Sequence, residues 1–406
     1  MMAAVKVLML AQSPVEGDSR VLRQAAALAE GGHAVHIIGR EVPDGFEAGP
    51  SVTVESAARG SGLRRGRGAR YAGPVSRGTV ATGELPRAAG VVTAGRRLAR
   101  WLLLPEHRRR TERQWRVDVT RRLAASMPYD VVHAHDFNTL ELGVRLAESW
   151  SAALVYDSHE LWFDRSLPGR PTPLWRARGR RRESRLARRA RTVFTVSDGI
   201  ARRLRDRGLP DVRVVRNTFP RRNQPPRSPE RPTGVVYAGR IAAGRDIETV
   251  AAAACRLTPL RTVLMGSADP GFHFDRRSVE TADATSIDGV DQILREFGIA
   301  LVTLTDGCEN HRLALPNKLF HAVRAGVPVV AADLPELRAM VTGHRLGALY
   351  RPGDLSALVD AVRAVIADYP SRLADVRAAA EELTWEHDAR TVVSCYEELD
   401  ARRRAR

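Results

Sequence analysis

Short runs of β-branched and other apolar residues alternate along the chain with longer segments in which Ala, Leu and Arg recur at helical spacing. The first pair is an apolar run at residues 5–10 and a segment at 19–31 whose apolar positions include Val21, Leu22 and Leu28. Such alternation is typical of βα units, because parallel strands are joined by crossover helices. The pattern predicts an α/β protein built on parallel sheets.

The alternating pattern falls into two blocks. We predict further strands of the first block at residues 34–38, 131–133, 153–156 and 192–196, and strands of the second at 234–238, 262–265, 299–304 and 327–331. Residues 221–229 between the blocks are polar and hold three prolines, which is typical of an exposed linker. We therefore expect two Rossmann-like domains with parallel sheets, at residues 1–220 and 233–385, joined by a linker at 221–232.

The chain is strongly basic, with 64 Lys and Arg against 47 Asp and Glu and a formal net charge of +17. Nucleic acid, an anionic membrane surface and nucleotide phosphates all suit such a charge. Aromatic residues make up only 5% of the chain, so it lacks the interleaved stacking platforms of single-strand binders, and we expect no nucleic-acid partner. Lysine occurs only at Lys6 and Lys318, which draws attention to the second of them.

Cysteine use and hydropathy indicate the compartment. Cys255, Cys308 and Cys395 are widely spaced and form no CxxC pair, as in a reduced cytosolic protein. The chain opens on a strand-like run instead of a secretion signal, and no apolar stretch reaches the roughly 20 residues of a membrane-spanning helix. We expect a cytoplasmic protein.

Two basic segments, at residues 96–122 and 175–191, place Trp and Leu among many arginines. Amphipathic basic helices of this kind rest on anionic membranes, so peripheral contact with the inner face of the membrane is one interpretation. The other is an ordinary helix whose arginine face is solvated.

Polar residues follow the first predicted strand, in a loop that leads directly into a helix and contains Gly17, Asp18 and Arg20. Ligands bind open α/β sheets at the carboxyl ends of the strands, and helix N-termini attract anions. The loop is therefore a candidate binding element. Asp18 and Ser19 also suit a plain helix N-cap.

Two further strands of the first block end in polar groups, His133 to Asp136 and then His159 with Glu160. Alternation along a strand makes His133 and His135 point the same way, and strand ends face the cleft. A polar catalytic contact, a metal site and a structural histidine bonded to a carbonyl are all compatible with this pair. No third ligand follows at zinc-like spacing, so we predict no metal.

In the second block, Gly239 follows the first strand and precedes Arg240 and Arg245. Glycine permits close approach of a ligand, and guanidinium forks match phosphate oxygens. Farther on, Pro316 and Lys318 stand at the start of a helix, where free N–H groups and the helix dipole favour an anion. Together these residues have the form of a diphosphate site, although Pro316 also suits a simple helix start.

Taken in order, these motifs resemble the retaining glycosyltransferases of family 4. The resemblance covers nearly the whole chain and runs through residues 18–23, 130–136, 155–160, 195–200, 216–217, 237–245, 315–320 and 325–330. It implies two Rossmann-like domains facing each other across a cleft, the GT-B fold. It also implies that the segment from 386 to 406 is a helix that packs back on the first domain.

The resemblance implies that the second domain binds a nucleotide-sugar, most simply of UDP or GDP, and that the acceptor occupies the first domain. The implied donor-binding residues are Gly239, Arg240, Arg245, Gly266, Leu313, Pro316, Asn317, Lys318, Leu319 and His321. The implied acceptor-binding residues are Gly17, Asp18, Arg20, His135, Asp136, His159 and Glu160. His135, Arg240 and Arg245 would act in catalysis, the arginines by stabilising the departing diphosphate.

No metal or other cofactor is implied, and the chain contains no Asp-x-Asp triplet. The acceptor could be a small molecule, a lipid or a glycan. The chain departs from the family where Leu313 and His321 stand in place of two glutamates that usually contact the donor. An epimerase or phosphorylase-like enzyme on the same fold, and a non-catalytic basic protein, remain alternatives.

Overall fold

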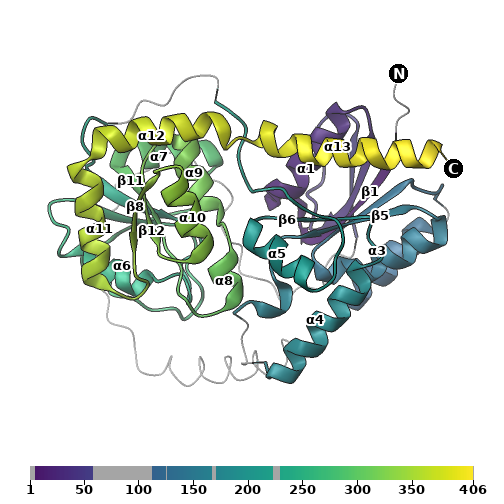
Figure 1. Ribbon diagram of the computed structural model, residues 1–406, viewed down its shortest axis with the longest axis horizontal. Helices are drawn as coiled ribbons and strands as arrows, with labels where there is room; N and C mark the ends of the chain where they lie inside the picture. Colours follow the sequence, from purple (N-terminus) through teal and green to yellow (C-terminus); the bar gives the residue numbers. More distant parts are fainter. Residues whose placement is uncertain (1–4, 58–111, 125, 167–170, 223–228, 406) are drawn as a thin grey trace.

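The computed structural model describes residues 5–57, 112–124, 126–166, 171–222 and 229–405. Two α/β domains lie side by side along the longest axis of the molecule (Figure 1). Each is built on one sheet whose strand pairs are all parallel. The predicted fold class is therefore confirmed. Residues 96–111 of the first basic segment and 223–228 of the predicted linker lie outside the described residues.

The first sheet has seven strands in the order β3-β2-β1-β4-β5-β6-β7. Their bounds are β1 Lys6–Pro14, β2 Ala34–Arg40, β3 Val52–Ser56, β4 Val131–His135, β5 Ala153–Ser158, β6 Thr192–Thr195 and β7 Val212–Val214. The helical elements are η1 Val15–Gly17, α1 Ser19–Glu30, α3 Phe137–Trp150, η2 Trp162–Asp164, α4 Pro173–Ala187 and α5 Asp198–Asp206. All five residues of β4 are buried, as expected for a central strand covered on both faces.

Alternate residues of the first sheet enter two different cores. Leu8 and Leu10 pack with apolar residues of α3 and α5 on one face, together with Trp115 from a helical segment at residues 112–123. Val7 and Met9 pack on the other face with residues of α1 and of the final helix, α13 Trp385–Arg404. The period-2 alternation of strand side chains thus fixes which helices cover each face.

The second sheet has six strands in the order β10-β9-β8-β11-β12-β13. Their bounds are β8 Gly234–Ala238, β9 Arg261–Met265, β10 Glu280–Ala282, β11 Gly298–Val302, β12 Val329–Ala332 and β13 Gly347–Tyr350. The helices are α6 Ile247–Ala254, α7 Ile287–Phe297, α8 Glu309–Leu313, α9 Asn317–Ala325, α10 Pro335–Gly343, α11 Leu355–Ala367 and α12 Tyr369–Glu382. They enclose a single large core.

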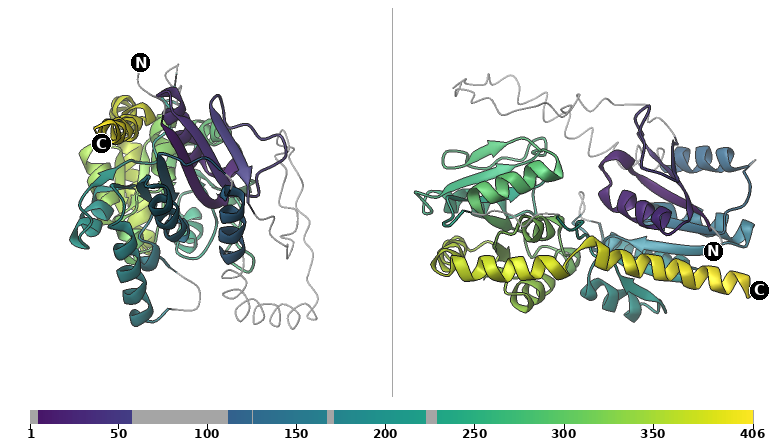
Figure 2. Two further views of the ribbon diagram at one scale, coloured as in Figure 1. Left: turned by 90° about the vertical axis from the view of Figure 1, so that its right-hand side faces the viewer. Right: turned by 90° about the horizontal axis from the view of Figure 1, so that it is seen from above.

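The chain crosses between the domains twice, and the two crossings lie against each other. Phe219 on the outward crossing pairs in parallel with Thr384 on the return, and the Trp385 N–H donates to the Phe219 carbonyl at 2.9 Å. Helix α13 then runs back along the first domain beside α1 (Figure 2). The Thr218 hydroxyl donates to Asp388 of α13 at 2.6 Å, so the outward crossing is also hydrogen-bonded to the helix that follows the return crossing.

A second contact joins the domains between α5 on the first and α8 with α10 on the second. The Ser197 hydroxyl donates to the Leu313 carbonyl at 2.5 Å, and Arg202 pairs with the buried Glu336 at 2.9 Å. None of the described helices is both long and apolar enough to cross a bilayer.

Candidate active site

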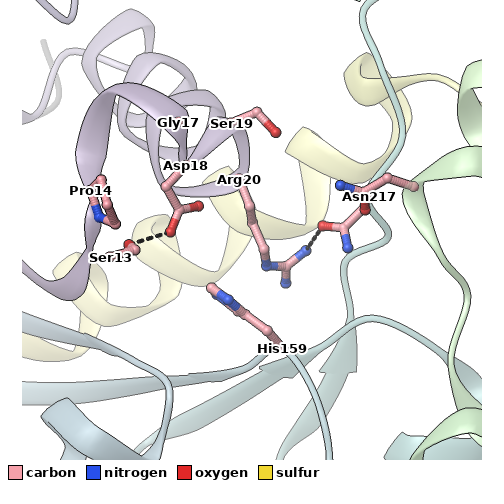
Figure 3. Close-up of a pocket in the computed structure, with 9 residues that line it drawn as sticks. Ser13, Pro14, Gly17, Asp18, Ser19, Arg20, His159 and Asn217 are labelled. Carbon is pink, nitrogen blue, oxygen red and sulfur yellow. Dashed lines mark hydrogen bonds between the residues drawn. The ribbon is translucent and has the colours of Figure 1, made fainter. Parts of the chain in front are cut away.

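A cavity of about 400 Å³ opens where the N-terminus of α1 faces the second domain (Figure 3). It is lined by Ser13, Pro14, Gly17, Asp18, Ser19, Arg20, His159, Asn217 and Asn317. Asn317 comes from the first turn of α9, so both domains contribute to the walls. The cavity thus brings together the loop after β1, the residue after β5 and the helix that carries Lys318.

Asp18 is the N-cap of α1, which was one of the two interpretations of this loop, and its side chain also lines the cavity. Its carboxylate accepts from the Val21 N–H at 3.2 Å and from the Ser13 hydroxyl at 2.5 Å. Burial raises the pKa of Asp18, but the nearby charge of His159 and the Ser13 hydrogen bond outweigh it, so the pKa is lowered. The cavity therefore carries a fixed negative charge beside Gly17.

Arg20 is buried and is held by protein groups. It donates from Nε and Nη2 to the Asp157 carboxylate at 2.9 and 2.8 Å, and from Nη1 to the Val215 carbonyl at 2.7 Å and to Asn217 at 3.1 Å. Arg20 lines the cavity, but these bonds tie α1 to β5 and to the outward crossing. The structure thus gives Arg20 a positioning role, and the predicted contact of Arg20 with an acceptor stays a prediction.

His135 and His159 meet over the Asp157 carboxylate. His159 Nε2 lies 3.3 Å from Asp157 and its Nδ1 lies 3.4 Å from Asp136, while His135 Nδ1 lies 3.3 Å from His159 Nε2. Burial lowers the pKa of His159. The negative charges of Asp136 and Asp157 together outweigh burial and raise this pKa to about 9. Burial lowers the pKa of His135. At neutral pH the pair therefore consists of an imidazolium facing the cavity and a neutral imidazole behind it.

Asp136 is half-buried next to His159 and has an unusual backbone conformation, with φ 64° at a residue that is not glycine. Burial raises its pKa to about 6. Glu160 turns the other way, toward Arg165 at 2.5 Å and Asn310 of α8 at 3.4 Å. Glu160 was predicted to contact the acceptor, but it bridges the two domains and does not line the cavity.

Ligand atoms of His133, His135 and Asp157 lie within 4.8 Å of one another, close enough to hold a metal ion. The Asp157 carboxylate already accepts the Arg20 fork and the Gln24 amide, and His159 beside it is cationic. A cation would be repelled by both charged neighbours. The chemistry of this donor set does not suit a metal, and the prediction of a metal-independent site stays a prediction.

Tyr396 of α13 lies behind the site, in contact with His133, and no local sequence pattern indicated this contact. Its hydroxyl lies 2.9 Å from His133 Nδ1, and the His133 ring stacks on that of His135 with centroids 4.3 Å apart. Burial keeps the pKa of His133 well below its ordinary value. A row of buried rings therefore runs from α13 to His135.

On the second domain, the turn after β8 packs directly against Lys318. A Cβ on Gly239 would lie 2.9 Å from Lys318 Cε, and Lys318 Nζ lies 4.7 Å from the centre of the Tyr237 ring. Gly266 follows β9 and approaches Gly239 so closely that a Cβ there would lie 2.1 Å from the Gly239 carbonyl. Only glycine suits both positions, since both also have φ above 130°.

Lys318 and Arg245 form a pair of like charges at this turn. Burial and the charge of Arg245 lower the pKa of Lys318 to about 7. Within the described ranges, neither side chain has a carboxylate within ion-pair distance. Arg240 differs, because it is exposed and pairs through two hydrogen bonds with Asp269. The free positive charge therefore lies at Arg245 and Lys318 rather than at Arg240.

Of the ten predicted donor residues, only Asn317 lines the cavity. Leu319 is fully buried in the second core. Leu313 packs against Gly199 at the contact between the domains, where a Cβ on Gly199 would lie 2.9 Å from it. His321 lies on α9 with its ring 4.2 Å from that of Phe219 and its Nδ1 3.5 Å from Asp291. Pro316 precedes α9 as its N-cap, next to Asn317 in the cavity wall.

Residues 17–220 match the family description "Glycosyl transferase 4-like domain", and residues 232–368 match "Glycosyl transferases group 1". The chain belongs to the family of the glycosyl transferase 4-like domain, whose match covers half of its length. The match confirms the predicted enzyme class, because both matched descriptions are of glycosyl transferases. The two matched segments correspond to the two domains of the structure.

This glycosyltransferase is 25% identical over 305 residues to glycogen synthase from Mycobacterium tuberculosis, covering 70% of this chain and 68% of the relative. Among solved structures it is similar to sucrose-phosphate synthase from Thermosynechococcus elongatus, with a TM-score of 0.67, 17% identity and coverage of 98% and 99% of the two chains. It is also similar to Anabaena HepE in complex with UDP-glucose, with a TM-score of 0.66, 15% identity and coverage of 97% and 100%. These structures share the two-domain fold.

Proposed function

We propose that this glycosyltransferase transfers a sugar from a nucleoside-diphosphate sugar, of UDP or GDP, to an acceptor hydroxyl, with retention and without a metal. The observation that carries the proposal is the pair Lys318 and Arg245, two cations at the turn after β8 that lack a carboxylate partner among the described residues. A diphosphate supplies the charge that such a pair lacks. The UDP-glucose complex of the similar HepE structure is consistent with a donor of this class.

Departure of a nucleoside diphosphate builds negative charge on the leaving oxygen. Lys318, Arg245 and the free N–H groups at the start of α9 would stabilise this charge, and each such contact is typically worth a few kcal/mol. Gly239 and Gly266 are both partly exposed and carry no side chain, so a phosphate could approach the backbone of this turn. Charge stabilisation by this cluster would take the place of a metal ion.

On the first domain, the cavity beside α1 is the proposed acceptor site. His159 supplies a cation and Asp18 a carboxylate to hold hydroxyl groups, while neutral His135 lies behind them against the same carboxylate network. In the proposed reaction, the acceptor attacks the face from which the diphosphate leaves, and its proton passes to a phosphate oxygen. The departing phosphate oxygen is the base in this step, so no side chain of the protein has to accept the proton.

The donor site can be tested by thermal-shift titration with UDP, GDP, TDP and ADP. One nucleotide should raise the melting temperature of the wild type by mass action, and the shift should disappear in the Arg245→Ala/Lys318→Ala variant. The Arg256→Ala/Arg363→Ala variant, with two exposed arginines of the same domain removed, serves as a control. Equal shifts in all three proteins, or none in any, would contradict the donor site.

We also propose that α4 makes peripheral contact with an anionic membrane surface. Its first turn exposes Leu174 (58%) and Trp175 (43%), and arginines follow along the helix. Apolar side chains that enter the headgroup region next to basic ones are typical of interfacial helices. Leu174→Ser/Trp175→Ser should weaken co-sedimentation with phosphatidylglycerol vesicles, whereas Ile287→Ser, at an exposed apolar site of the second domain, should not. Equal binding by all three proteins would contradict this contact.

A further inference from the structure

A second hollow, of about 640 Å³, lies at the amino ends of strands in the first sheet. The active-site cavity lies at the opposite, carboxyl ends of the strands. The second hollow is formed where β5, β6 and β7 begin and where α13 ends, and its charged lining residues are Arg188, Arg189, Arg191, Asp211, Arg213 and Arg402. The end of α13 is also the end of the molecule remote from the second domain (Figures 1 and 2). We call this site the arginine hollow, after its five arginines.

Two of the five arginines are neutralised by the protein. Arg213 pairs with Glu398 at 2.7 Å and with Asp211 at 3.1 Å, and Arg189 pairs with Glu148 at 3.1 Å. These contacts leave the other three arginines of the hollow to be explained.

Arg188 donates to the backbone carbonyls of Arg207 and Gly208 at 2.7 and 3.4 Å. Across the described ranges of the chain, no carboxylate lies within ion-pair distance of Arg188, Arg191 or Arg402. The hollow therefore collects positive charge that the described structure does not balance.

The Arg-rich composition of the chain does not by itself explain this concentration. Many arginines elsewhere on the surface reach a carboxylate, for example Arg261 with Glu280 and Arg338 with Asp333. Like charges gathered in one concavity repel each other and focus a positive field into it. Guanidinium groups present paired donors that match phosphate oxygens, and an anion would relieve the repulsion.

We propose that the arginine hollow binds a multiply charged, phosphate-bearing ligand at a site separate from the sugar-transfer cleft. Such a ligand would bridge elements that are distant in sequence, because Arg188 and Arg191 lie between α4 and β6 whereas Arg402 lies on the last turn of α13. A bound ligand would therefore link the end of α13 to the first sheet. The site does not depend on the proposed donor chemistry.

The test is a calorimetric titration with inorganic pyrophosphate at constant ionic strength. It is done in an Arg245→Gln/Lys318→Gln background, which removes the two free cations of the cleft. Further substitution of Arg191→Gln/Arg402→Gln should weaken pyrophosphate binding at least fivefold. The matched control adds Arg256→Gln/Arg363→Gln, at exposed arginines of the second domain, and should leave binding unchanged. Absence of binding in the background protein, or equal weakening by both pairs, would overturn the proposal.

A second arm identifies the source of the phosphate group. Vesicles of phosphatidylglycerol and of phosphatidylcholine are compared by co-sedimentation, with and without pyrophosphate. If pyrophosphate weakens sedimentation with phosphatidylglycerol, and the Arg191→Gln/Arg402→Gln protein sediments less than the wild type, the hollow binds a lipid headgroup. If pyrophosphate binds in the hollow and the two substitutions leave sedimentation unchanged, the hollow binds a soluble phosphate compound.

In either case, hydrogen exchange in the last turn of α13 should slow on binding, and unchanged exchange would contradict the bridging role.

Discussion

Among single residues, Lys318 carries the charge whose state matters most for the proposed reaction. The residue lies in the first turn of α9 and has a pKa of about 7, because burial and Arg245 both disfavour its charged form. It is therefore charged at pH 6 and largely neutral at pH 8. Most lysines titrate near 10.4, so this side chain alone can make diphosphate binding depend on pH near neutrality.

We expect UDP affinity to fall as pH rises from 6 to 8.5. Each unit by which bound diphosphate raises the pKa of Lys318 corresponds to about a tenfold change in affinity across the titration. The Lys318→Arg variant stays charged and should bind with a much flatter pH profile, measured by calorimetry in matched buffers. If the wild type and Lys318→Arg have parallel profiles, the pH dependence belongs to the nucleotide or to another group.

At the level of elements, α13 matters because it supplies Tyr396 to a row of rings ending at His135. The Tyr396→Phe variant keeps the ring but leaves His133 Nδ1 without its partner at 2.9 Å. We expect a lower kcat with little change in KM for the donor, and a loss of stability of about 1–3 kcal/mol for the unsatisfied buried group.

The control for Tyr396 is Tyr369→Phe. Tyr369 is also buried, and its hydroxyl donates to the Gly298 carbonyl at 3.1 Å in the core of the second domain. Both variants should lose stability, but only Tyr396→Phe should lower kcat and alter its pH profile. Equal effects on kcat would mean that Tyr396 serves stability alone.

The longer elements could be predicted from the sequence because their hydrophobic pattern is local. Strand β8 and the start of α9 were predicted at their observed positions. The short edge strands β3, β7, β10 and β13 were not predicted, because runs of three to five residues are too short for an alternation to stand out, even where β3 alternates in burial. Periodicity thus identifies buried strands better than edges.

The site was predictable only in part. Strand ends indicated His135 and His159, since parallel topology brings such ends together, and a helix start indicated Lys318. Arg20 was predicted to bind the acceptor, but its bond to Asp157, which spans 137 residues of sequence, could not be predicted. The contact between Tyr396 and His133 spans 263 residues and leaves no periodic trace in the chain. Pairing of polar groups across such separations depends on the packed structure, which local patterns do not encode.

For the whole molecule, the contact of α5 with α8 and α10 holds the domains together on the side away from the crossings. Glu336 is buried there beside the N-terminus of α5 and pairs with Arg202 at 2.9 Å. Glu336→Gln keeps the shape but removes the charge. We expect the domains to separate more often, which small-angle scattering would record as a larger radius of gyration, together with weaker apparent nucleotide affinity.

The Arg338→Gln variant is the matched comparison, because Arg338 pairs with Asp333 within the second domain alone. It should leave both the radius of gyration and nucleotide affinity at their wild-type values. A Glu336→Gln protein that is as compact as Arg338→Gln would show that the crossings suffice to hold the domains together.

The return of α13 has a consequence for biosynthesis. Val392, Tyr396 and Leu399 complete the core that α1 and the first strands begin, so the first domain is built from both ends of the described chain. During translation, that core stays open until α13 has left the ribosome, whereas the second domain can close earlier. The domain made first is thus the one finished last, and its uncovered α1 face is where a chaperone would be needed.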